Sequence, residues 1–185
     1  MVALAEMGDK TQLLSFILAT RFVNRPGAII LGILAATLAN HFGAAYVGGW
    51  VASHVGRDTL RWVLAASFFA FAAWALKPDK LEAGGASQAG HGAFLTTLVV
   101  FFLAEMGDKT QLATIALGAR YASLAAVVIG TTAGMMAANI PAVLLGERLA
   151  RTIPLRAMRV AAAASFAVFG LLLLFDVDLG LGLGR

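Results

Sequence analysis

The chain carries the stretch LAEMGDKTQL twice, at residues 4–13 and again at residues 103–112. Both copies lie in apolar surroundings, although each contains a glutamate, an aspartate and a lysine within five residues. An ionised group near the centre of a bilayer costs roughly 2.5 to 3.5 kcal/mol, so charge in a membrane segment needs a partner or a bound ion. The repeated stretch, called the motif below, is therefore predicted to be a functional site.

The composition is typical of a membrane protein. Of the 185 residues, 60% are hydrophobic and 13% are charged, and the mean hydropathy is +0.84. Apolar runs of about 20 residues are long enough to cross about 30 Å of hydrocarbon as helices. The alternation over about ten residues that marks membrane β-strands is absent. The predicted class is an all-α membrane protein.

Two counts exclude other kinds of function. The chain has no cysteine, which rules out disulfides and thiolate metal sites. Its net charge of +4 would raise nucleic acid as a partner in a soluble protein. Here the basic residues lie mainly in short loops between apolar runs, where they orient a membrane protein, so no nucleic-acid partner is predicted.

Six transmembrane helices are predicted, arranged as two repeats of three. The spans are expected at about 1–20, 28–51, 62–76, 93–118, 124–145 and 157–175. Residues 1–76 form the first repeat, 77–92 a polar cytoplasmic linker, and 93–185 the second repeat with a short C-terminal tail.

The correspondence between the repeats extends beyond the motif. At an offset of 99, Asn40 matches Asn139, and at an offset of 98 the segment 65–68 matches 163–166. Because each repeat has an odd number of spans, the second enters the membrane from the opposite side. This predicts a 3+3 inverted-topology repeat in which both motifs meet near the midplane.

Basic residues predict the orientation. The loops after the first, third and fifth spans carry eight of them and the other side carries four, which places the odd loops in the cytoplasm and both termini outside. The eight are Arg21, Arg25, Lys77, Lys80, Arg148, Arg151, Arg156 and Arg159, and the four are Arg57, Arg61, Arg120 and Arg185. Twelve residues of predicted span precede Glu105 but only five precede Glu6, so the natural start is expected upstream.

The motif offers oxygen ligands for a cation. Residues three apart on a helix share a face, so Glu6 with Asp9 and Glu105 with Asp108 are expected to bring four carboxylates around one point. Neutral oxygens within reach are expected from Thr11, Thr110, Gln12, Gln111, Asn40 and Asn139. Such shells suit Ca²⁺, Mn²⁺ or Mg²⁺.

Glycine and lysine complete the motif. Gly8 and Gly107 would let a partner backbone approach closely, or let the helix loosen and free carbonyl oxygens. Lys10 and Lys109 would tune the charge: four carboxylates and two lysines sum to −2, which one divalent cation or two protons would neutralise. A site that holds either a metal or protons meets the requirement for exchange by alternating access.

Three other functions are alternatives to transport of a cation: a purely structural role, export of small solutes, and intramembrane hydrolysis. Glu6 with Lys10, and Glu105 with Lys109, have the spacing of intrahelical ion pairs in a purely structural protein, which would leave the aspartates unexplained. An exporter of small solutes of the amino-acid type would favour a net positive site. An intramembrane hydrolase would not need a symmetric duplication.

The histidines receive no functional role from their spacing. His41, His54 and His91 lack a second ligand at a suitable separation, so they are interpreted as interface or loop residues.

The two E-x-G-D-K-T motifs, 6–11 and 105–110, lie on the first and fourth predicted spans, on either side of a polar linker. They resemble the E-x-G-D-(K/R)-(T/S) signature of a family of small cation/proton exchangers, which includes Golgi-type, chloroplast and bacterial manganese/calcium transporters. The resemblance implies that Glu6, Asp9, Glu105 and Asp108 bind the cation, that Thr11 and Thr110 add oxygens, and that the lysines tune charge.

The resulting prediction is an antiporter of the inner (plasma) membrane that exports Mn²⁺, with Ca²⁺ as second candidate, in exchange for protons. It is not an enzyme and needs no cofactor. Its partners are membrane lipid and the cation. A monomer contains both halves of the site, so a homodimer is allowed but not required.

Overall fold

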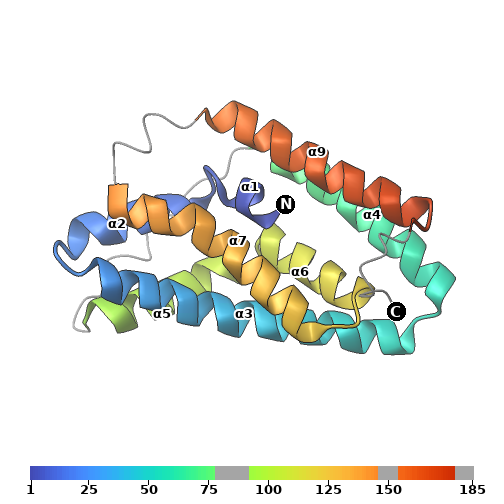
Figure 1. Ribbon diagram of the computed structural model, residues 1–185, viewed down its shortest axis with the longest axis horizontal. Helices are drawn as coiled ribbons and strands as arrows, with labels where there is room; N and C mark the ends of the chain where they lie inside the picture. The colour runs from blue at the N-terminus through green and yellow to red at the C-terminus, as the bar shows by residue number, and fades with distance from the viewer. Residues whose placement is uncertain (78–91, 146–153, 178–185) are drawn as a thin grey trace.

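A computed structural model describes residues 1–77, 92–145 and 154–177, and every element in this part of the chain is an α-helix (Figure 1). The elements are α1 (Val2–Glu6), α2 (Lys10–Arg21), α3 (Pro26–His54), α4 (Arg57–Ala75), α5 (Ala93–Glu105), α6 (Lys109–Arg120), α7 (Leu124–Leu145) and α9 (Leu155–Leu174). The predicted all-α class is confirmed. The linker, apart from its first and last residues, and the C-terminal tail beyond residue 177 lie outside the described residues.

Among the described residues, three helices are long and apolar enough to cross a membrane: Pro26–His54, Leu124–Leu145 and Arg156–Leu174. They correspond to the predicted second, fifth and sixth spans. Helix α4 covers the predicted third span but begins at Arg57, five residues earlier than expected, and its first turns carry three charged residues.

Each motif interrupts the span that contains it. The first predicted span consists of α1 and α2, and the fourth consists of α5 and α6. At the breaks Gly8 has φ 81° and Gly107 has φ 75°, a left-handed conformation that glycine adopts without the clash of a Cβ. The expectation that each motif's two acids share one face of a continuous helix is therefore wrong, because the helix stops between them. Of the two roles considered for the glycines, the structure shows the loosened helix.

Replacing Gly107 with alanine should destabilise the protein by about 1 to 2 kcal/mol, because alanine resists a positive φ. A Cβ at Gly107 would meet none of the described residues within 4 Å, so the cost is assigned to the backbone angle. Gly130 offers a matched control: it too has open space around it, but it lies inside α7, where alanine favours the helix. Thermal unfolding in detergent micelles should separate the two variants, and equal stabilities would contradict the assigned backbone.

The interrupted helices pack against long helices from the other half of the chain. Helices α1 and α2 lie along α7, and α5 and α6 lie along α3. Gly32 of α3 meets Thr97 and Gly48 meets the backbone of Ile115, so α3 runs parallel to α5 and α6. These close approaches leave no room for a side chain at either glycine, which brings the helix backbones together.

Helices α4 and α9 pair along one side of the bundle (Figure 1). Four phenylalanines fill their interface: Phe68, Phe71, Phe166 and Phe169. Phe68 and Phe166, which occupy matching positions of the two sequence repeats, are both fully buried, and their ring centroids lie 6.3 Å apart. Equivalent residues of the two halves thus contact each other.

Candidate metal centre

The two breaks bring acids from both motifs together. Glu6, Asp9 and Asp108 each place one carboxylate oxygen within 4.8 Å of the other two, and all three residues are buried. Ligands on opposite sides of a cation with bonds of about 2.1 to 2.6 Å lie about 4.2 to 5.2 Å apart, so this cluster has the right size for one ion. The fourth predicted acid, Glu105, is buried nearby in the second motif but is not a member of this group of three.

Each motif glutamate is held by the threonine of its own motif. Thr11 Oγ1 donates a hydrogen bond to Glu6 Oε2, and Thr110 Oγ1 donates one to Glu105 Oε1, both at 2.6 Å. The second oxygens, Glu6 Oε1 and Glu105 Oε2, are buried and have no hydrogen-bond partner among the described residues. Because buried polar atoms nearly always have a partner, these two oxygens are the ones best placed to bind a cation or a proton.

The lysines pair across the two motifs. Lys10 Nζ lies 3.1 Å from Asp108 Oδ1, and Lys109 forms an ion pair with Asp9 Oδ1. The intrahelical pairs considered from the spacing, lysine with the glutamate four residues earlier, are therefore contradicted. The helix break moves each lysine toward the opposite motif. The lysines balance the aspartates and leave both glutamates without a basic partner in their own motif.

The glutamines close the breaks. The Oε1 atom of Gln12 accepts a hydrogen bond from the backbone nitrogen of Gly8 at 2.8 Å, and Gln111 does the same for Gly107 at 2.7 Å. Through its amide nitrogen Gln12 also bonds to the carbonyl of Ala138, 3.1 Å away on α7. These contacts fix the left-handed glycines and tie the first break to the helix from the other half.

The two predicted asparagines bridge helices beside the breaks. Asn40 of α3 donates to the carbonyl of Phe102 at 3.1 Å, three residues before Glu105. Asn139 of α7 accepts a hydrogen bond from Ser15 Oγ at 2.8 Å. Both are buried, so each places an amide next to the motif helix that it contacts.

One residue at the centre was missed from the sequence. His41 is fully buried on α3, its Nε2 lies 4.0 Å from Glu105 Oε1, and neither ring nitrogen has a hydrogen-bond partner among the described residues. A signal was present, because His41 follows Asn40 directly and its match at an offset of 99 is Ile140, which breaks the repeat. His54, by contrast, is exposed at the end of α3, and His91 lies outside the described residues.

Comparison with known proteins identifies a matching family model and several similar proteins. A family model described as "Divalent cation/proton antiporter GDT1" matches residues 1–83 and 93–179. A Vibrio cholerae protein named "Putative manganese exporter" is 50% identical over 171 residues, which cover 92% of this chain and 84% of that protein. GDT1-like proteins 5 and 4 of Arabidopsis thaliana are each 27% identical, over 92% of this chain and 90% of their own length. No solved structure matches the chain.

Proposed function

Because the chain belongs to the GDT1 family of divalent cation/proton antiporters, we propose that it exports Mn²⁺ from the cytoplasm in exchange for protons. The family confirms the resemblance found in the sequence. It makes the chain a multi-pass membrane transport protein for a divalent cation, and not an enzyme. The choice of Mn²⁺ is supported by the name of the Vibrio cholerae relative. Ca²⁺ is the second candidate, because it accepts the same oxygen ligands.

The observation that carries the proposal is the gathering of acids from both motifs. Glu6, Asp9 and Asp108 lie within 4.8 Å of one another in a buried place, and no simple structural role requires three acids there. Glu105, whose Oε2 has no hydrogen-bond partner in the described part of the chain, extends the cluster in our proposal. The threonine hydroxyls and the amides of the glutamines and asparagines supply further neutral oxygens.

The charge of the site supports the exchange of a cation for protons. The lysines already balance the aspartates, so the two glutamates remain as the groups for which the cation and the protons compete. One Mn²⁺ neutralises two glutamates, and so do two protons. We propose that the site is neutral when it binds either one Mn²⁺ or two protons. A buried site without net charge has the lowest free-energy cost during a conformational change.

Alternating access is proposed to use an inverted repeat of six spans, with residues 1–76 and 93–185 as its halves. Three features support it: the reciprocal ion pairs between motifs, the matching packing of the interrupted helices against α7 and α3, and the contact between the equivalent Phe68 and Phe166. Reciprocal contacts, in which residue i meets j′ and j meets i′, are expected of units related by a two-fold axis. Rocking of one half against the other would then expose the motif cluster to each side in turn.

The proposed location is the plasma membrane, with the linker in the cytoplasm and both termini outside. The excess of basic residues in the odd loops supports this orientation. Since one chain holds both motifs, a monomer suffices for the site.

The test is metal uptake into proteoliposomes that carry an imposed pH gradient, comparing Mn²⁺, Ca²⁺ and Mg²⁺. We expect saturable Mn²⁺ flux that collapses when the gradient is dissipated with a protonophore. Flux of Ca²⁺ without flux of Mn²⁺ would show that Ca²⁺, the second candidate, is the exported ion. No cation flux from folded protein would overturn it.

Replacing His41 with glutamine should lower Mn²⁺ exchange by about 10- to 100-fold, the usual cost of losing a group that supports a metal-site carboxylate. We expect this loss because the imidazole ring of His41 lies beside the carboxylate of Glu105. His54→Gln makes the same change on the same helix at an exposed site and should leave exchange unchanged. If both variants transport like the unmodified protein, His41 only fills space.

A further inference from the structure

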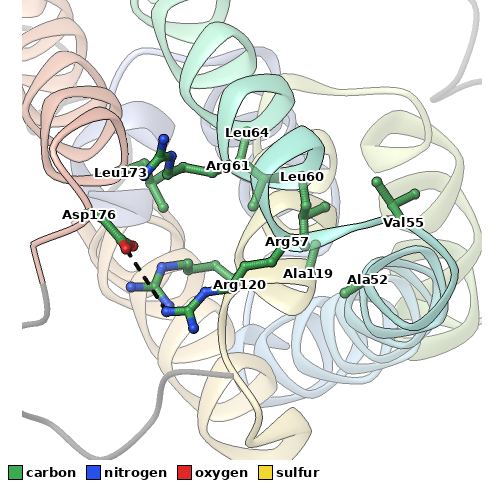
Figure 2. A pocket seen from close by; sticks show the side chains of 10 residues that line it. All are labelled: Ala52, Val55, Arg57, Leu60, Arg61, Leu64, Ala119, Arg120, Leu173 and Asp176. Atoms are coloured by element: carbon green, nitrogen blue, oxygen red, sulfur yellow. Dashed lines mark ion pairs between the residues drawn. The ribbon is translucent and has the colours of Figure 1, made fainter.

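A pocket at one end of the bundle is a second candidate site. There α3, α6 and α9 end and α4 begins, around a pocket of about 180 Å³ (Figure 2). Its polar lining consists of three arginines, Arg57, Arg61 and Arg120, and one acid, Asp176. The remaining lining is apolar and is made by Ala52, Val55, Leu60, Leu64, Ala119 and Leu173.

The positive charge of this pocket is not balanced by the described residues. Arg57 pairs with Asp176 at 3.9 Å, but both side chains are well exposed, so the pair is weak. Arg61 and Arg120 form no ion pair within residues 1–77, 92–145 and 154–177. The Nε atom of Arg61 is also buried and lacks a hydrogen-bond acceptor there. An arginine fork with an unused buried donor points to an anionic ligand.

Aromatic rings lie beside two of the three arginines. The guanidinium of Arg61 lies 5.8 Å from the ring centroid of Trp62, and that of Arg120 lies 5.9 Å from that of Tyr121. Tryptophan and tyrosine at the ends of membrane helices mark the level of the lipid headgroups. The pocket therefore combines guanidinium groups at the expected level of the headgroups with an apolar wall.

We propose that Arg57, Arg61 and Arg120 bind the phosphate of an anionic phospholipid, whose first acyl carbons lie against Leu60, Leu64 and Leu173. Guanidinium groups bind phosphate oxygens in pairs of hydrogen bonds, and the apolar wall distinguishes a lipid from free phosphate. Arg57 and Arg61 come from α4, whereas Arg120 comes from α6, which begins inside the second motif. A bound headgroup would link the α4 and α9 pair to the helices of the cation site.

The proposal is tested by thermal unfolding of the full chain in neutral detergent with added phosphatidylglycerol, phosphatidylcholine or inorganic phosphate. We expect phosphatidylglycerol to raise the unfolding temperature more than either of the other two. The variant Arg61→Gln/Arg120→Gln should weaken the apparent lipid affinity at least tenfold. Arg61→Lys/Arg120→Lys keeps the charge but loses the planar guanidinium groups. Its apparent lipid affinity should lie between that of the unmodified chain and that of the glutamine variant.

Arg21→Gln/Arg25→Gln removes two arginines at the opposite end of the bundle and serves as the control, which should respond to phosphatidylglycerol like the unmodified chain. Equal stabilisation of all variants would overturn the proposal, because it would show a non-specific response to anionic micelles. A full effect of inorganic phosphate alone would overturn the assignment to a lipid. Transport is not needed for either result, so the outcome is independent of the exchange assay.

Discussion

Replacing Glu6 with glutamine should abolish cation exchange while leaving the fold intact. Glutamine has the same length and can still accept the hydrogen bond from Thr11, so the packing of the break survives. What it loses is the negative charge at the buried Oε1, which has no other partner among the described residues. Removal of one charged partner from a buried ionic site costs about 3 kcal/mol or more, which corresponds to a fall of at least about 100-fold.

The measurement is the initial rate of Mn²⁺ exchange in proteoliposomes, with reconstituted protein quantified for each variant. Asp58→Asn removes a negative charge by the same chemistry at an exposed position of α4 and should transport normally. Glu105→Gln should fail like Glu6→Gln, because both glutamates have the same threonine contact and a second oxygen without a hydrogen-bond partner among the residues that the structure describes. Exchange at the unmodified rate by folded Glu6→Gln protein would remove this residue from the cation site.

Much of the fold follows from apolar runs alone. The span predicted at 124–145 has the bounds of α7, and the one at 28–51 lies inside α3. These runs are long, predominantly apolar and free of Asp, Glu, Lys and Arg, so length and composition suffice. The acids, threonines and amides of the candidate site could also be named from the sequence as candidates, because polar groups in such runs are rare enough to point to function.

The geometry within the motif could not be predicted in the same way. Arguments from helical spacing assume a continuous helix, whereas Gly8 and Gly107 turn the chain between the acids. The choice between a close helix contact and a break depends on tertiary contacts, here the bonds of Gln12 and Gln111 to the glycine backbone. The pairing of Lys10 and Lys109 with the opposite motif, and the place of His41 beside Glu105, likewise appear only when the halves pack together.

The second large effect is expected on stability, from breaking the ion pairs between the two motifs, Lys109 with Asp9 and Lys10 with Asp108. Asp9→Asn should cost about 3 to 5 kcal/mol of stability, because it breaks the ion pair with Lys109, in which the lysine side chain is only 4% exposed. Asp108→Asn should cost less, because the side chain of Lys10 is 26% exposed and can turn toward water. Thermal unfolding in detergent micelles should rank the two variants in this order, and the reverse order would contradict the burial of Lys109.

Adding Lys109→Met to Asp9→Asn separates folding from transport. The double variant carries neither charge, so most of the lost stability should return, since a buried ion pair can often be replaced by apolar groups at little cost. Exchange should remain at least about 100-fold below that of the unmodified chain, because Asp9 is also one of the three acids that lie within 4.8 Å of one another. If stability and exchange return together, Asp9 serves only to balance Lys109, and the cation must be held without it.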